Sequence, residues 1–432
     1  MNAGEHVEVE TYLSVREIKE MQQKLTIKQL KNITLESQGL LRRSAFGNGK
    51  KAVLKGLEHL GYLQIDTLSI VERAHHHTLW TRIPDYKVSY LEELVKEHHV
   101  FEYWFHAASY LPMKDFRFVL PQMLEVKQNE SHYYNADPKV MQYVIDTIRA
   151  EGPKRARDFE NETKKMGSWW NWKPTKIALE RLFLQGDLMI SERDGMQKTY
   201  DIAERVLPKN IDLTKPSSLE FAEYLVKTYL RAYGWTTVKQ ITHLKAGEAI
   251  RNNVNEVLNA LIEDDIVEKV TIEGYPSVYV LRDLVDRRIA KTHGEISLLS
   301  PFDNAIIHRD RVQQFFGFEY RLECYTPKEK RQYGYFCLPI LFGNTFIGRV
   351  DCKAHRKNKQ LELIHLHIEK QSIDFELWGE PFVEIIKKFA TFNGCESIKL
   401  TQVSPLNNSL VIFLNNIFYQ YEATSVPIMA RF

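Results

Sequence analysis

Residues 52–66 read AVLKGLEHLGYLQID, which predicts a helix, a tight turn and a short strand. Four apolar residues recur at helical spacing on one face, namely Val53, Leu54, Leu57 and Leu60. Gly61 then ends the helix, as glycine commonly does. The pattern recurs at 177–190 (IALERLFLQGDLMI) and at 254–270 (VNEVLNALIEDDIVEKV).

A second short strand follows a turn in two of these three copies, at 198–202 and at 277–281. The first copy has no clear counterpart of that strand. Helices followed by a hairpin are typical of the winged helix, a fold that contacts DNA in many proteins and other proteins in some. The three copies therefore predict three tandem winged-helix units.

The last third of the chain changes to a pattern of strands. Two apolar runs, 333–341 and 345–354, flank a Gly-Asn pair that is typical of hairpin turns. Residues 361–368 alternate apolar and polar side chains, as a half-buried strand does. A helix is expected at about 380–393, with Pro381 in its first turn. We predict a small antiparallel β-barrel-like domain that this helix closes.

The predicted fold class is therefore α+β, with four domains. The first winged-helix unit, at 11–125, carries the candidate chemistry, and the second and third units cover 126–210 and 211–290. The β-barrel-like domain with its closing helix covers 291–432.

The composition is that of an ordinary globular protein. Of the 432 residues, 44% are hydrophobic and 26% are charged, and the formal net charge is +2. The sequence has no run of 18 apolar residues and no apolar secretory segment, and its four cysteines form no CxxC pair. The common phosphate, dinucleotide and zinc-protease motifs are missing too. We expect a cytoplasmic protein with reduced thiols, no cofactor and no membrane contact.

The basic residues are unevenly distributed along the chain. Between residues 24 and 55, eight lysines and arginines face one glutamate, and between 154 and 176 seven face three acids. Such stretches can neutralise DNA phosphates, although a solvated helix face gives the same pattern. The residues from these stretches that we assign to DNA contact are Arg42, Arg43, Lys50, Lys51, Lys154, Arg155 and Arg157.

Gln64 and Asp66 lie two positions apart on the predicted strand, after the first helix. A strand would place both side chains on one face, about 7 Å apart, with Leu63, Ile65 and Thr67 on the other. A carboxylate and a carboxamide at this spacing can hold one water between them. The alternative is the exposed face of an ordinary strand.

Arg73 and three consecutive histidines, His75, His76 and His77, follow shortly after. Adjacent histidines on a strand point to opposite faces, so the three cannot readily ligate one metal ion. We expect these four residues to contact phosphates or the damaged strand, and we expect no metal site.

The motif Gln64-Ile65-Asp66 is followed by ERAHHHTLW at 72–80 and by RIPDY at 82–86. This combination resembles the YcaQ/AlkX branch of the AlkZ-like DNA glycosylases, whose catalytic motif is Gln, a hydrophobic residue, and then Gln or Asp. The Asp at the third position matches the YcaQ branch, since the AlkZ branch has Gln there. The run 299–354 also resembles the C-terminal part of that family.

The resemblance implies a DNA glycosylase whose catalytic residues are Gln64 and Asp66. Its substrate would be double-stranded DNA with alkylated or crosslinked purines, including interstrand crosslinks joined through guanine N7. A purine made cationic at N7 or N3 leaves readily, so Asp66 would activate water and stabilise the oxocarbenium-like sugar while Gln64 orients the water. We expect a monofunctional DNA-repair enzyme that acts as a monomer.

Two other functions fit the same units. One is a non-catalytic tandem winged-helix transcription regulator, and the other is a chromosome-associated module that binds distorted DNA. Neither function requires a carboxylate paired with a carboxamide beside a run of histidines.

Overall fold

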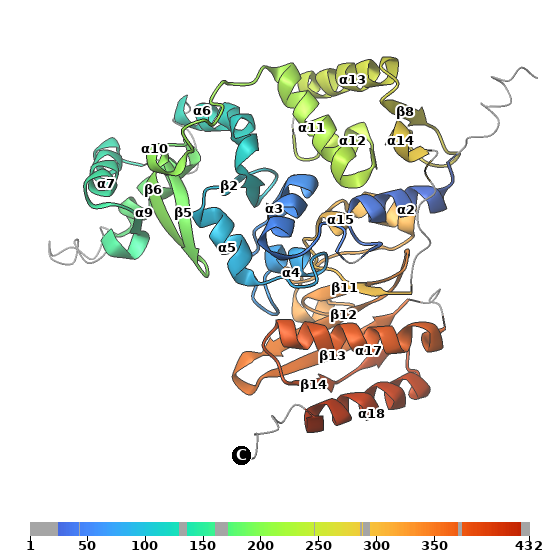
Figure 1. Cartoon of the computed structure of the whole chain (residues 1–432). Coiled ribbons are helices and arrows are strands. Elements are labelled where there is room, and N and C mark those ends of the chain that lie inside the picture. The colour runs from blue at the N-terminus through green and yellow to red at the C-terminus, as the bar shows by residue number, and fades with distance from the viewer. Residues whose placement is uncertain are drawn as a thin grey trace, which may run out of the picture.

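The computed structural model describes residues 25–42, 44–128, 136–159, 172–245, 247–285, 287, 294–369 and 374–424. Within these ranges, three helix-and-sheet units stand over a larger C-terminal sheet (Figure 1). The expected α+β class is confirmed. None of the described helices combines the length and the apolar character that crossing a bilayer requires.

The three units share one order of elements. Each runs helix, strand, two helices and then two strands, and the first strand pairs with the last in every sheet. The first unit consists of α3 (Gly49–Leu60), β1 (Leu63–Gln64), α4 (Ala74–Trp80), α5 (Val88–Lys96), β2 (Val100–Trp104) and β3 (Ala108–Pro112). Two further helices flank it, α2 (Ile27–Ser37) before and α6 (Leu120–Gln128) after.

The second and third units repeat this order. The second has α7 (Pro138–Glu151), β4 (Lys154–Arg155), a short helical turn at 156–159, α9 (Trp172–Leu184), β5 (Leu188–Asp194), β6 (Gln197–Ile202) and the short α10 (Ala203–Val206). The third has α11 (Ser218–Tyr233), β7 (Trp235–Thr236), α12 (Val238–Ile241), α13 (Glu248–Glu263), β8 (Val267–Val270), β9 (Val278–Leu281) and α14 (Arg282–Val285).

The repeat inferred from the sequence was aligned wrongly in its first copy. Residues 52–66 form the first helix and first strand of their unit, whereas 177–190 and 254–270 form the third helix and second strand. The true counterpart in the first unit is α5 with β2, and its hairpin is β2–β3, which the sequence did not reveal. The mistake has a physical cause: an apolar helix face, a turn and a strand look alike wherever they occur in a unit.

Gly61 shows why the turn between α3 and β1 needs glycine. Its φ is +84°, which side chains disfavour. A Cβ there would also lie 2.4 Å from Cγ2 of Thr228 on α11, so the third unit packs directly on this turn. The start of β1 is thereby fixed against the third unit.

The C-terminal sheet has six described strands in the order β10-β11-β12-β13-β14, with β15 also pairing with β13. They are β10 (Ile296–Leu298), β11 (Cys337–Phe342), β12 (Thr345–His355), β13 (Gln360–Ile368), β14 (Ser397–Leu400) and β15 (Val403–Ser404). Register shifts after Ile340 and Asp351 let the sheet curl. We expected a wholly antiparallel sheet. This prediction is wrong for two strands, because β14 and β15 both run parallel to β13.

Helix α17 (Phe375–Phe392) covers this sheet and buries Trp378 and Phe382 against it (Figure 1). It begins earlier than expected because Asp374 caps it by accepting a hydrogen bond from the Glu376 amide. Pro381 therefore lies inside the helix and not in its first turn. Two short helices, α15 (Asn304–Ile307) and α16 (Arg309–Phe316), follow β10, and α18 (Asn408–Thr424) comes last.

Two buried ion pairs join parts that are distant in the sequence. The Arg82 guanidinium contacts both carboxylate oxygens of Asp303 at 2.7 and 2.8 Å, and neither side chain is exposed. Arg193 on β5 likewise contacts both oxygens of Glu102 on β2, with its Nη2 2.8 Å from Oε2. The first unit is thus fixed to both the C-terminal part and the second unit.

Candidate active site

Gln64 and Asp66 lie at the end of a strand that is shorter than expected. β1 contains only Leu63 and Gln64, which pair with Tyr110 and Ser109 of β3. The strand then ends in a turn, where Asp66 Oδ1 accepts a hydrogen bond from the Leu68 amide at 3.0 Å. Because of this turn, Asp66 is buried and Thr67 is exposed, the reverse of what continued alternation predicts.

The Asp66 carboxylate has one engaged and one free oxygen. Oδ2 is buried and has no hydrogen-bond partner among the described residues. Burial raises the pKa of Asp66 to about 6, and the Leu68 and Thr67 amides and the charge of Arg73 offset only part of this effect. A carboxylate with a raised pKa and a free oxygen is suited to accept a proton at neutral pH.

Gln64 is oriented by a residue that the sequence did not single out. His106 lies in the turn between β2 and β3, and its Nε2 is 3.1 Å from Gln64 Oε1. Since a carboxamide oxygen only accepts, Nε2–H of His106 donates, and the Gln64 amide NH2 remains available as a donor. The pairing of β1 with β3 brings His106 to Gln64, and no motif in the sequence links the two residues.

The three consecutive histidines are interior residues on α4, not the DNA-facing residues that the sequence suggested. His75, His76 and His77 are all at most 5% exposed. His76 Nδ1 is 2.7 Å from the Tyr86 hydroxyl, and His77 Nε2–H donates to the Leu298 carbonyl at 3.0 Å. Burial lowers the pKa of His77 to about 4, so its ring is neutral. Direct contact with phosphate is therefore closed to them in this structure.

The segment that follows Asp66 is bound to the C-terminal sheet. The Ala354 amide on β12 donates to the Ile70 carbonyl at 2.9 Å. Arg356 donates to the carbonyls of Ser69 and Val71 at 2.8 and 3.1 Å. The catalytic candidate is thus held from one side by the first unit and from the other by residues almost 300 positions later.

Arg73 lies near Asp66, since its charge counteracts the raised pKa of that carboxyl. It also lies beside the β5–β6 turn, where a Cβ on Gly195 would be 3.7 Å from Arg73 Nη2. Its Nε is buried without a hydrogen-bond partner among the described residues. Arg73 is therefore near Asp66, and its expected contact with DNA stays a prediction.

The other basic residues assigned to DNA contact differ in whether a carboxylate already pairs with them. Lys50 is held by Glu93 at 3.1 Å and Glu97 at 2.6 Å, whereas Lys51 is exposed with no carboxylate within ion-pair distance among the described residues. In the second unit Lys154 pairs with Glu151 at 2.6 Å, Arg155 pairs with Asp194 at 3.1 Å, and Arg157 is exposed. Arg42 is exposed, and Arg43 lies outside the described residues.

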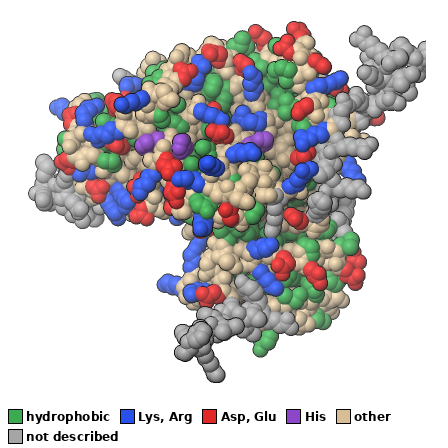
Figure 2. Space-filling view, in the orientation of Figure 1, with side chains coloured by type: hydrophobic (Ala, Val, Ile, Leu, Met, Phe, Trp, Pro, Cys, Tyr) green, Lys and Arg blue, Asp and Glu red, His purple; other side chains and the backbone are tan. Residues whose placement is uncertain are grey.

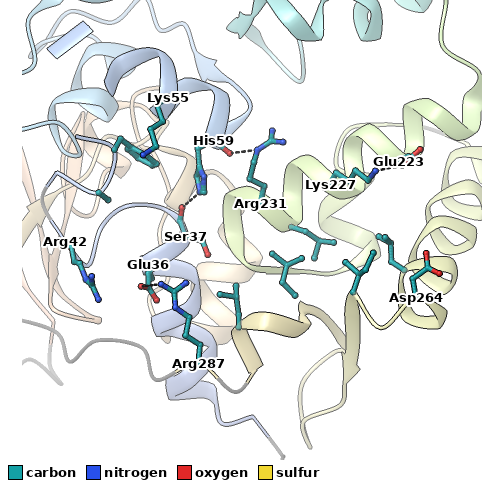
Figure 3. A pocket seen from close by; sticks show the side chains of 17 residues that line it. Glu36, Ser37, Arg42, Lys55, His59, Glu223, Lys227, Arg231, Asp264 and Arg287 are labelled. Atoms are coloured by element: carbon teal, nitrogen blue, oxygen red, sulfur yellow. Dashed lines mark hydrogen bonds and ion pairs between the residues drawn. The ribbon is translucent and has the colours of Figure 1, made fainter. Parts of the chain in front are cut away.

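A basic cavity of about 690 Å³ lies between the first and third units (Figure 3). It is lined by five cationic side chains, Arg42, Lys55, Lys227, Arg231 and Arg287, against the acids Glu36, Glu223 and Asp264. Glu36 pairs with Arg287 at 3.5 Å. Neither Gln64 nor Asp66 lines this cavity, so it is separate from the candidate catalytic pair. On the face shown in Figure 2, basic and acidic side chains are interspersed, in keeping with the low net charge.

Comparison with known proteins gives two findings. The family model described as "DNA glycosylase AlkZ-like" matches residues 57–380, well over half of the chain and including Gln64 and Asp66. The fold is similar to that of the DNA glycosylase AlkZ from Streptomyces sahachiroi, with a TM-score of 0.59 at 14% sequence identity over 88% of this chain and 100% of that one. At this identity the second likeness concerns the fold alone. On the strength of the family match, the chain belongs to the AlkZ-like DNA glycosylase family.

Proposed function

We propose that the protein is a monofunctional DNA glycosylase that hydrolyses the N-glycosidic bond of purines alkylated at N7 or N3. The observation that carries this proposal is the buried Asp66 carboxylate, with its raised pKa and its free oxygen. It lies two residues from Gln64, a carboxamide that His106 orients. A buried carboxylate with an unpaired oxygen costs folding free energy, and a DNA-binding regulator does not need one.

The pair supports a simple hydrolytic step. One N–H of the Gln64 amide can donate to the oxygen of a water molecule, and Asp66 Oδ2 can accept a proton from that water. The water oxygen then bonds to the deoxyribose C1′ as the bond from C1′ to the purine nitrogen breaks. The electron pair of that bond goes to the purine, and the negative charge of Asp66 stabilises the positive sugar in the transition state.

The same pair explains the preference that we propose for cationic lesions. A purine that already carries a positive charge leaves as a neutral molecule and needs no acid to protonate it. Gln64 cannot supply a proton, and Asp66 is committed to the base role. We propose that guanine N7 interstrand crosslinks are included, and that the Asp at the third position of the motif places the chain in the YcaQ/AlkX branch.

Release of free 7-methylguanine from duplex DNA in a single-turnover assay tests the function. We expect an abasic product with an intact strand and no adduct trapped by borohydride, because no lysine lies between Lys55 and Lys87 in the sequence around the pair. A crosslinked duplex joined through guanine N7 serves as the second substrate. If neither substrate loses a base, the regulator becomes the better explanation.

His106 should act as a positioning residue for Gln64. His106→Ala frees the Gln64 amide to rotate, and we expect base release about 5- to 10-fold slower, equivalent to one neutral hydrogen bond of about 1 kcal/mol. His106→Gln, which can donate from a similar position, should restore most of the rate. The pH profile should keep its shape in both variants, since Asp66 still accepts the proton. Equal loss in both variants would point to a packing role instead.

We propose that the first unit contacts the DNA backbone through Lys51, Arg42 and the basic cavity. Lys51→Gln should lower duplex affinity at every sequence and reduce the salt slope by about 1, because one phosphate contact is lost. Lys50→Gln is the matched control, since Glu93 and Glu97 already neutralise Lys50. Binding titrations at several salt concentrations measure both slopes. The same slope for Lys51→Gln and for the unmodified protein would remove this surface from the interface.

We also propose that each unit with the shared order of elements is a winged helix, so that the predicted domains stand as 11–125, 126–210, 211–290 and 291–432. The support is the common sheet order, in which the first strand pairs with the last. We further propose a cytoplasmic monomer whose partner is damaged duplex DNA.

A further inference from the structure

The loop between α16 and β11 presents an aromatic side chain to solvent. The Tyr325 side chain is 85% exposed. A large aromatic ring in this position adds little to folding, because it buries almost no surface. None of the steps described above uses it.

Strand β12 contacts both this loop and the segment after Asp66, because Asp351 accepts from the Tyr335 and Phe336 amides and the Ala354 amide donates to the Ile70 carbonyl. Burial, and after it the negative charge of Asp66, raises the pKa of the Cys324 thiol. The neighbouring Cys324, then burial and then Asp66 raise the pKa of the Tyr325 hydroxyl. Such effects act over short distances. Packing agrees with them, because Leu322 on the loop and Leu68 after Asp66 lie against the same apolar core of the C-terminal sheet.

The loop is held firmly at its base. The Glu323 carboxylate accepts hydrogen bonds from the amides of Gln332, Tyr333 and Gly334 at 2.8 to 3.0 Å. Asp351 on β12 accepts two more, from the amides that follow Gly334, at 2.9 Å each. A Cβ on Gly334 would lie 2.2 Å from Asp351 Oδ2, so the loop passes too close for any other residue. Tyr325 is therefore presented from a fixed base, which lowers the entropy cost of a contact.

The tip of the loop is basic as well as aromatic. Lys328 and Lys330 are exposed three and five residues after Tyr325, and Glu329 lies between them. The Arg331 Nε donates to the Thr326 carbonyl at 2.8 Å and so closes the tip. An aromatic ring close in sequence to cationic side chains is the combination that binds the bases and phosphates of opened nucleic acid.

We propose that the Tyr325 ring stacks on a DNA base next to the sugar that Asp66 faces, while Lys328 and Lys330 contact the flanking phosphates. This inference rests on the proposed glycosylase function and extends it to recognition of the duplex at the lesion. Stacking of this kind accepts any base, because every base has a π face. It also suits a crosslinked purine, which is tethered to the opposite strand and cannot swing into a closed pocket.

The test compares Tyr325→Ala with Tyr325→Phe on a duplex that carries 7-methylguanine beside 2-aminopurine. We expect Tyr325→Ala to lower kcat/KM for base release about 5- to 100-fold, the range for loss of one stacked aromatic. Tyr325→Phe keeps the ring and should stay within about twofold. The 2-aminopurine fluorescence change on binding should persist in Tyr325→Phe and disappear in Tyr325→Ala. Tyr419→Ala, which removes another exposed tyrosine on α18, is the matched control and should change neither signal.

Each other outcome overturns the proposal or separates it from the glycosylase function. Unchanged fluorescence and rate in Tyr325→Ala would exclude stacking while leaving the glycosylase intact. Equal losses in Tyr325→Phe and Tyr325→Ala would assign the effect to the hydroxyl and overturn stacking. The unmodified protein could release no base and still give a 2-aminopurine fluorescence change that Tyr325→Ala abolishes. That result would support stacking and reject the glycosylase function. Melting temperatures should not change, because the side chain is exposed.

Discussion

Asp66→Asn should slow the release of 7-methylguanine by about 10²- to 10⁴-fold, the range for loss of a positioned acid or base. The substitution keeps the shape of the side chain and its bond to the Leu68 amide, and removes the charge and the proton acceptor. The unmodified protein should lose activity about tenfold per pH unit below pH 6, since burial raises the pKa of Asp66 to about 6. The variant should show no such dependence. Single-turnover assays across pH 5 to 9 measure both effects, and DNA affinity at each pH is the control.

The same substitution should stabilise the fold. The folded-state pKa of about 6 lies above the value of about 3.9 for an unfolded aspartate. The folded state therefore binds the proton more tightly, and ionisation of Asp66 costs stability as pH rises from about 4 through 6. Removing the charge should recover about 1 to 3 kcal/mol at pH 8, since two pKa units correspond to about 3 kcal/mol.

The stability gain should be smaller at pH 5, where Asp66 is mostly protonated in the folded state. Urea unfolding at both pH values measures it, and Asp264→Asn, at an exposed position, should change neither midpoint. A variant that is inactive and less stable at pH 8 would mean that Asp66 is a structural residue. Loss of activity with a gain of stability is the signature of a functional carboxylate.

Asp303→Asn should be the most destabilising conservative change, by about 3 to 5 kcal/mol. Both side chains are fully buried in the folded protein. The substitution therefore leaves the positive charge of Arg82 buried without an opposite charge to compensate it. Replacing both partners, in Arg82→Met with Asp303→Leu, should recover part of the loss because no lone charge remains. Urea unfolding measures each variant. Glu396→Gln, which breaks the exposed pair with Lys359, should have no measurable effect. A double variant as unstable as Asp303→Asn would contradict this account.

Local patterns in the sequence predicted the elements that local forces determine. The helix 51–60, its stop at Gly61 and the later hairpins at 188–202 and 267–281 all follow from periodicity and turn residues. The predicted strand through Asp66 is longer than the observed one. Apolar and polar residues continue to alternate in the sequence, but the chain turns where the Leu68 amide donates a hydrogen bond to the Asp66 carboxylate. Periodicity over three identical residues likewise could not reveal that His75 to His77 lie on a helix.

Local sequence patterns could not predict the parts of the site that depend on contacts between residues far apart in the sequence. The pairing of β1 with β3 brings His106 to Gln64 across 42 positions. The segment after Asp66 is fixed by Arg356, which donates to the carbonyls of Ser69 and Val71. The family resemblance pointed to Gln64 and Asp66, but nothing in the sequence alone indicated their surroundings.

The attachment of residues 69–77 to the sheet beyond residue 296 has a consequence for the newly made chain. A ribosome releases the first unit long before β12, and until then neither the Ile70 carbonyl nor His77 has its partner. The Asp66 carboxylate therefore reaches its final environment only when most of the polypeptide has been synthesised. If Asp66 activates water as proposed, incomplete chains that bind DNA would be unable to remove its bases.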